Sequence, residues 1–194
     1  IKNAGISKFL LLGMGGSSLA PEVIATVFPD SSFRRGMDAS GKRQSPVQFA
    51  ILDSTDPTQV AQVAREFPPG ESLYIVSSKS GGTIEVNALL EYFWSLSRKD
   101  GSRFAAITDT GTSLEALAKE RNFRAILLAD ASVGGRFSVL ADFGLFPMAL
   151  MGLDLSAMLD SAGRMMRSCQ PDRPAACNPG VGLGLIIAYA ASKG

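Results

Sequence analysis

The strongest constraint on the fold is an alternation between short apolar runs and longer segments of helical period. Five runs have the length and composition of buried strands: 9–12, 48–52, 73–76, 104–107 and 125–128. Four helical segments lie between them: 19–27, 57–67, 84–96 and 113–121. Because the links are short, we expect right-handed crossovers and a parallel sheet covered on both faces. The alternation predicts an α/β fold with a doubly wound, five-stranded parallel sheet.

The pattern changes after residue 141, where only helical segments follow. They are expected over 143–152, 156–168 and 180–192, in addition to the flavodoxin-like core. Three prolines between residues 170 and 179 are typical of a hinge or linker. We therefore expect one domain over residues 1–169, followed by a linker and helix over 170–194.

Local signals predict where two helices begin. Asp56 precedes Pro57, the pairing of an N-cap with a proline at the first helical position. Ser113 follows a turn-like stretch and is expected to cap the next helix. Residues 35–46 contain several glycines and serines and are expected to form a polar surface loop.

Composition excludes several classes of protein. The chain has 46% apolar residues, which excludes an intrinsically disordered segment. No apolar run approaches the roughly 18–20 residues that span a bilayer, so we expect no membrane insertion. The net charge of +1 offers no general electrostatic footprint for nucleic acid. A small anion would therefore have to be bound by local geometry.

Histidine is absent from the sequence, so no side chain has an ordinary pKa near neutrality. The chain also opens at Ile1 without an initiator methionine, and we expect it to be part of a longer polypeptide. Cys169 and Cys177 are the only cysteines, and without a histidine they make a poor metal site. Two free thiols in a reducing cytoplasm are the expected state.

Residues 13–18, here called the glycine loop, follow the first predicted strand with three glycines in four residues. Glycines let a ligand approach the backbone closely, and the following helix offers unpaired N–H groups. The spacing Gly13-x-Gly15-x-x-Ser18 departs from a dinucleotide fingerprint at its last position. A tight strand-to-helix turn without a ligand is the alternative interpretation.

Residues 77–83, here called the serine loop, follow the third predicted strand. They combine four hydroxyl groups, a lysine and two glycines at the start of a helix. A phosphate dianion requires such hydroxyls and amides, and the helix dipole favours its charge. The alternative is that these residues only cap the helix.

Residues 134–138, here called the arginine segment, place two glycines directly before Arg136. A permanently charged guanidinium suits an oxyanion that develops during a reaction. The alternative is a surface arginine beside a turn. Three loops at strand ends, all suited to an anionic ligand, together predict a sugar-phosphate site.

The motifs GMGGSSLAP at 13–21, SKSGGTIE at 78–85 and GGRFS at 134–138 resemble three signatures of the phosphoglucose isomerase family. The resemblance covers nearly the whole chain and implies a sugar isomerase (SIS) domain, with residues 170–194 leading toward a second one. The stretches LDSTDP at 52–57 and GLFPMALMG at 144–152 are most similar to the bacterial form fused behind a transaldolase.

The resemblance implies isomerisation of glucose 6-phosphate to fructose 6-phosphate through a cis-enediolate, without a metal or organic cofactor. It implies Arg136 as the catalytic residue that stabilises the enediolate. Hydroxyl groups of the serine loop, with the Lys79 backbone, hold the phosphate, and residues of the glycine loop border the sugar. The implied substrate-binding residues are Gly16, Ser17, Ser78, Lys79, Ser80, Thr83 and Gly135.

The sequence departs from the commoner family pattern at several positions. Gly81 and Gly82 replace a bulkier residue and a threonine, and Ser18 stands where many members have aspartate. Three family groups have no counterpart here: a glutamate base, a ring-opening histidine from the partner subunit, and a C-terminal lysine. Glu85 is a poor substitute, because a helix N-terminus lowers a carboxyl pKa. We therefore expect a homodimeric full-length enzyme and a fragment that is inactive alone.

Two other functions stay open from the sequence. A non-catalytic SIS module that senses sugar phosphates would need the serine loop but not Arg136. A nucleotide-binding oxidoreductase domain would need a complete glycine fingerprint.

Overall fold

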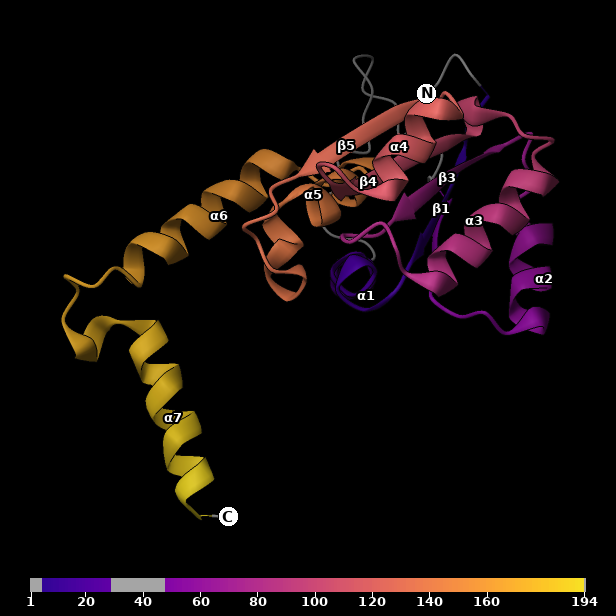
Figure 1. The fold of residues 1–194 in the computed structure, drawn as a ribbon. Helices are drawn as coiled ribbons and strands as arrows, with labels where there is room; N and C mark the ends of the chain where they lie inside the picture. The colour runs from indigo at the N-terminus through magenta and orange to yellow at the C-terminus, as the bar shows by residue number, and fades with distance from the viewer. Residues whose placement is uncertain (1–4, 29–47, 194) are drawn as a thin grey trace, which may run out of the picture. The chain divides into compact units, whose positions relative to one another are not determined.

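A computed structural model describes residues 5–28 and 48–193, and the expected surface loop at 35–46 lies outside these ranges. Five parallel strands form one sheet in the order β2-β1-β3-β4-β5. Figure 1 labels β1, β3, β4 and β5 of this sheet. They are β1 (Lys8–Gly13), β2 (Gln48–Leu52), β3 (Ser72–Ser77), β4 (Phe104–Asp109) and β5 (Ala125–Ala129). All five lie where the sequence predicts them, so the predicted doubly wound α/β fold is confirmed.

Helices follow the strands as the helical period predicts. The first unit contains α1 (Leu19–Val27), α2 (Pro57–Glu66), α3 (Ile84–Leu96), α4 (Ser113–Glu120) and α5 (Asp142–Leu150). Among the residues described in this unit, short 3₁₀ helices lie between a strand and a helix at η2 (Gly15–Ser17), η3 (Gly101–Arg103) and η4 (Gly135–Leu140). The first part of η4 differs from the sequence-based expectation, which was a loop.

The predicted caps had different outcomes. The Asp56 side chain caps α2 by accepting hydrogen bonds from the amides of Thr58 and Gln59, at 3.0 and 2.9 Å, which confirms the prediction. The prediction for α4 was wrong by one residue. Thr112 is its N-cap and accepts from the Glu115 amide, whereas the Ser113 hydroxyl donates to the carbonyl of Gly81 at 2.9 Å. Ser113 therefore ties α4 to the serine loop.

Two apolar clusters fill the two faces of the sheet, because successive strand residues point to opposite sides. Leu10 and Leu12 of β1 belong to the cluster covered by α2, α3 and α4. Leu11, between them, belongs to the cluster covered by α5. α1 packs beside α5 (Figure 1). Both clusters are buried within this unit, so the loops at the strand ends rest on a rigid framework.

Contacts divide the chain into two units, residues 1–153 and residues 154–194. The second unit contains α6 (Leu155–Ser168), η5 (Ala175–Cys177) and α7 (Pro179–Lys193), and neither α6 nor α7 has a buried residue. These helices lie where the sequence predicts helices. The expected domain boundary near residue 169 stays a prediction. Within the described ranges, no helix has both the length and the apolar character needed to cross a membrane.

Candidate functional site: loops at the carboxyl ends of the strands

The strand order reverses between β1 and β3. From β1 the chain moves outward to β2, then returns to β3 and continues through β4 to β5 on the other side. In open parallel sheets, ligands bind outside the carboxyl ends of the strands at such a switch point. The glycine loop follows β1 and the serine loop follows β3. The topology therefore brings these two loops to the position where a ligand is expected.

The glycine loop is packed against the serine loop. The Ser77 hydroxyl donates to the Ser17 carbonyl at 2.9 Å, and both residues are buried. A Cβ atom at Gly13 would lie 3.3 Å from the Ser77 Cβ, so a side chain there would crowd the contact. Gly15 has a φ of +54°, a conformation that favours glycine. Close packing accounts for Gly13, and a positive φ accounts for Gly15. The glycine loop is thus a tight turn that is hydrogen-bonded to the serine loop.

Two hydroxyl groups of the serine loop converge at the start of α3. The Ser78 side chain is buried, and its Oγ lies 3.2 Å from the Thr83 Oγ1. Thr83 is the N-cap residue of α3, yet its hydroxyl accepts no cap hydrogen bond. The first turn of a helix also presents backbone N–H groups without intrahelical partners. The alternative that these hydroxyls only cap the helix therefore does not describe Ser78 and Thr83.

Ser80 differs from these two residues. It is exposed, and its Oγ accepts a hydrogen bond from the Gly82 amide at 3.3 Å. This bond closes a small turn within the serine loop. The Ser80 hydroxyl proton is still available to a ligand, so the residue keeps a donor on the outer side of the loop.

Gly81 is fixed in place. Its φ is +67°, and a Cβ atom there would lie only 2.7 Å from the Thr112 Cβ. Its amide donates to the Ser78 carbonyl at 3.2 Å, and its own carbonyl accepts from Ser113. Gly82 is exposed, with open space around its Cβ position. Packing and hydrogen bonds therefore restrain Gly81, whereas nothing packs against the Cβ position of Gly82.

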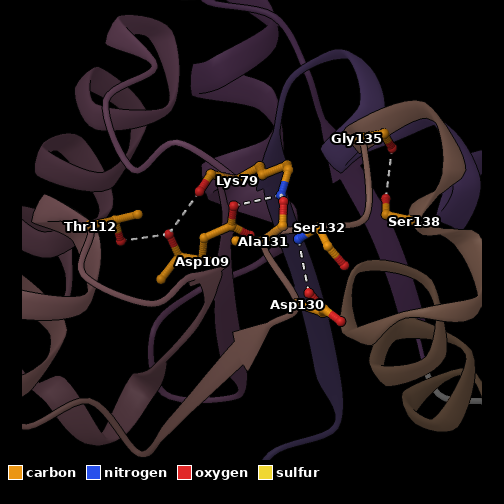
Figure 2. Close-up of polar contacts among 9 residues, drawn as sticks. Lys79, Asp109, Thr112, Asp130, Ala131, Ser132, Gly135 and Ser138 are labelled. Atoms are coloured by element: carbon orange, nitrogen blue, oxygen red, sulfur yellow. Dashed lines mark hydrogen bonds and ion pairs between the residues drawn. The ribbon is translucent and has the colours of Figure 1, made fainter.

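The Lys79 ammonium is engaged by protein groups. Its Nζ lies 2.5 Å from the Asp109 Oδ2 and 3.3 Å from the Ala131 carbonyl oxygen (Figure 2). From the sequence, this cation is expected to be one of the groups of the serine loop that suit a phosphate. The structure instead pairs it with a carboxylate and leaves the backbone of Lys79 as its contribution to the serine loop.

The arginine segment forms the start of η4 and lies against the glycine loop. A Cβ atom at Gly16 would lie 2.9 Å from the carbonyl carbon and oxygen of Gly135. The Ser138 hydroxyl donates to the same carbonyl at 2.7 Å (Figure 2). The Arg136 side chain is exposed and makes no hydrogen bond or ion pair within residues 5–28 and 48–193. Its guanidinium donors are therefore available to a ligand.

Two carboxyl groups, those of Asp130 and Glu85, belong to the segments that surround the site. Hydrogen bonds from Ser132 hold the pKa of the Asp130 carboxyl below its ordinary value, and the nearby Lys79 charge contributes to the shift. Glu85 lies exposed in the first turn of α3. Across the part of the chain that the structure describes, no group of three or more His, Cys, Asp or Glu side chains is arranged to hold a metal ion.

Sequence reasoning missed Asp109 and Ala131, which engage Lys79. Asp109 does carry a signal, because it ends a buried parallel strand at the same edge as the other loops. Ala131 contributes only a carbonyl oxygen, which no residue pattern can indicate.

The sequence pattern that defines the phosphoglucose isomerase family matches residues 2–192. The chain belongs to the phosphoglucose isomerase family. It is 32% identical over 168 residues to a glucose-6-phosphate isomerase of Carboxydothermus hydrogenoformans, covering 84% of this chain and 35% of that protein. It is 34% identical over 166 residues to a glucose-6-phosphate isomerase of Synechococcus sp. (strain JA-3-3Ab), covering 82% of this chain and 29% of that protein. The chain thus spans about a third of the length of these relatives.

Solved structures share the fold. A hypothetical protein from Thermus thermophilus superposes with a TM-score of 0.81 at 27% identity, over 97% of this chain and 43% of that one. A glucose-6-phosphate isomerase from Chlamydia trachomatis gives a TM-score of 0.66 at 26% identity, over 81% of this chain and 28% of that one. Family membership and fold therefore agree with the resemblance found in the three loop motifs.

Proposed function

We propose that this chain is the sugar-phosphate-binding portion of a glucose-6-phosphate isomerase. The observation that carries the proposal is the pair of hydroxyls on Ser78 and Thr83, which converge at the N-terminus of α3 without capping it. A phosphate dianion accepts hydrogen bonds from such hydroxyls and from first-turn amides, and the helix dipole favours its charge. Ser80 and the Lys79 backbone complete this phosphate site.

The sugar would extend from the phosphate site across the glycine loop. Gly16 and Ser17 border it there, because the glycine loop is hydrogen-bonded to the serine loop through Ser77. The close contact between Gly16 and Gly135 brings the arginine segment to the same side of the sheet. Arg136 then offers unpaired donors to the negative charge that develops on the enediolate oxygens.

Proton transfer between C1 and C2 needs a group that these residues do not supply. Arg136 cannot act as a base, because it does not deprotonate in proteins. As part of the proposal, a glutamate, a histidine from a second subunit of a homodimer and a lysine complete the reaction. The chain alone then binds sugar phosphate without turning it over.

Two finer parts of the proposal rest on other residues. The stretches 52–57 and 144–152 support the bacterial form that is fused behind a transaldolase. Cys169 and Cys177 are both free thiols, which supports a reducing, cytoplasmic setting.

The proposal is tested by titrating the protein with fructose 6-phosphate and following backbone NMR signals. We expect shifts at Ser78, Ser80 and Thr83, together with isomerase activity in the complete gene product. A response to NAD instead would favour a nucleotide-binding domain. Sugar-phosphate binding without isomerisation by the complete gene product would favour a non-catalytic sensor.

A further inference from the structure

Lys79 is attached to the end of β4 through its main chain. Its carbonyl accepts a hydrogen bond from the Asp109 amide at 3.2 Å and from the Thr108 hydroxyl at 3.4 Å. The Thr108 oxygen lies 2.8 Å from the Thr112 hydroxyl, which caps α4. These bonds fix the middle of the serine loop to β4 regardless of what the lysine side chain does.

The Lys79 side chain then reaches toward the next loop. Its ammonium bonds both to Asp109, at the end of β4, and to the carbonyl of Ala131, between β5 and η4 (Figure 2). The side chains of Lys79 and Asp109 are only 26% and 16% exposed, so solvent screens this ion pair less than a surface pair. A Cβ atom at Gly135 would lie 3.9 Å from the Lys79 Cδ, which places the lysine stem beside the arginine segment.

Residues 130–134, which contain Ala131 and are here called the Ala131 loop, connect β5 to η4 and lead directly to Arg136. Within it, the Ser132 amide donates to the Asp130 carboxylate at 2.8 Å, and the Val133 amide donates to the Asp130 carbonyl at 3.1 Å. These bonds shape the turn but do not attach it to the serine loop. The Lys79–Ala131 bond makes that attachment, and Asp109 holds the ammonium that donates it.

A direct phosphate-binding role for this ammonium is the competing interpretation. It conflicts with the position of Asp109, whose carboxylate at 2.5 Å would repel a phosphate dianion that approached the same nitrogen. The hydroxyls of Ser78 and Thr83 meet each other without involving the ammonium. The phosphate site and the ion pair are therefore separate structures that share one residue.

We propose that Lys79 and Asp109 are positioning residues, whose ion pair and bond to Ala131 hold the arginine segment at a fixed place relative to the serine loop. The proposal rests on the function proposed above, because it assigns these residues to the placement of Arg136 against bound sugar phosphate. Small displacements of a group that acts in the transition state lower turnover strongly, whereas ground-state binding at the serine loop is retained.

The test uses Lys79→Met and Asp109→Asn in the complete gene product, with fructose 6-phosphate as substrate. We expect each variant to lower kcat by about tenfold while KM changes by less than about twofold. The double variant should be no slower than either single variant, because both changes remove the same link. Lys79→Arg, which keeps the charge, should retain more of kcat than Lys79→Met.

Hydrogen exchange provides a readout that does not depend on activity. We expect faster exchange at residues 131–138 in Asp109→Asn, with unchanged exchange at residues 78–83. Glu115→Gln is the matched control, since Glu115 forms a similar 2.5 Å pair with Lys119 on α4. This variant should alter neither kcat nor exchange at residues 131–138.

Two results would overturn the inference. In the first, Lys79→Met raises KM and the inhibition constant of inorganic phosphate by tenfold, while Asp109→Asn lowers both, as a phosphate-binding ammonium predicts. In the second, exchange at residues 131–138 is unchanged in folded variants. If the unmodified protein does not isomerise fructose 6-phosphate, the proposed function fails, and hydrogen exchange alone decides whether the pair fixes the arginine segment.

Discussion

The serine loop and the arginine segment differ in how far their residues are buried and hydrogen-bonded within the protein. In the serine loop, Ser78 is buried and Gly81 is bonded at both its amide and its carbonyl. In the arginine segment, Arg136 is exposed and the neighbouring Phe137 is 80% exposed. The polar groups of the serine loop are largely bonded to one another, whereas the arginine segment presents a charge with unpaired donors. If the proposed function is correct, substrate affinity depends on the serine loop and turnover on the arginine segment, and mutations can distinguish the two.

The largest expected effect comes from removing the charge of the arginine segment. Arg136→Ala in the complete gene product should lower kcat by about 10²–10³-fold, the usual cost of losing a group that stabilises developing charge. KM should change little, because the serine loop is intact. Steady-state isomerase kinetics measure both quantities. Arg124→Ala is the control. Arg124 directly precedes β5 and donates a hydrogen bond to the Ser102 carbonyl, so its removal should leave kcat unchanged.

Removing a hydroxyl from the serine loop should have the opposite pattern. Ser78→Ala deletes a donor to the phosphate, and a hydrogen bond to a charged group contributes about 1.5–3 kcal/mol. Affinity for fructose 6-phosphate should therefore fall by about 10- to 100-fold, as measured by calorimetry. Ser97→Ala removes a buried hydroxyl at the far end of α3 and should leave this affinity unchanged. Equal losses of affinity in both variants would contradict the assignment.

Adjacent glycines of the serine loop provide a test of its rigidity. Gly81→Ala introduces a Cβ atom against Thr112 at a positive φ and should destabilise the protein by about 1–3 kcal/mol. Gly82→Ala meets open space and should change the free energy of unfolding by less than about 1 kcal/mol. Urea denaturation measures both. If the two substitutions had equal effects, the serine loop would be looser than its contacts indicate.

The smallest expected effect concerns the turn that precedes α4. Glu115 accepts hydrogen bonds from Lys119 and from the Gly111 amide, which hold its carboxyl pKa below the ordinary glutamate value. This interaction stabilises the fold above the unfolded-state pKa and is lost as pH falls through the lower folded-state pKa. Thermal unfolding of Glu115→Gln should therefore depend less on pH below about 5 than that of the unmodified protein. An unchanged pH dependence would contradict the shift.

Much of the fold follows from the sequence because its signals are local. Apolar runs such as 73–76 are buried on both faces of the sheet, so their composition alone identifies strands. The cap of α4 was misplaced by one residue because Thr112 and Ser113 are both good caps, and only the structure shows that Ser113 bonds to Gly81.

The site is less predictable because its contacts join residues that are distant in sequence. The two glycines before Arg136 adopt ordinary backbone conformations, since Gly134 has a φ of −61° and Gly135 begins a 3₁₀ helix. The close approach of the Gly135 backbone explains the glycine at 16, which no local pattern encodes, whereas a Cβ atom at Gly135 would make only an ordinary contact with the Lys79 Cδ at 3.9 Å. The pairing of Lys79 with Asp109 is likewise set by neighbouring strands, β3 and β4.

A crystal structure of the complete gene product with fructose 6-phosphate tests the central claim most directly. The account predicts a phosphate group within hydrogen-bond distance of the hydroxyls of Ser78, Ser80 and Thr83, with Lys79 still paired to Asp109. A phosphate bound elsewhere, with these hydroxyls occupied only by protein groups, would contradict it.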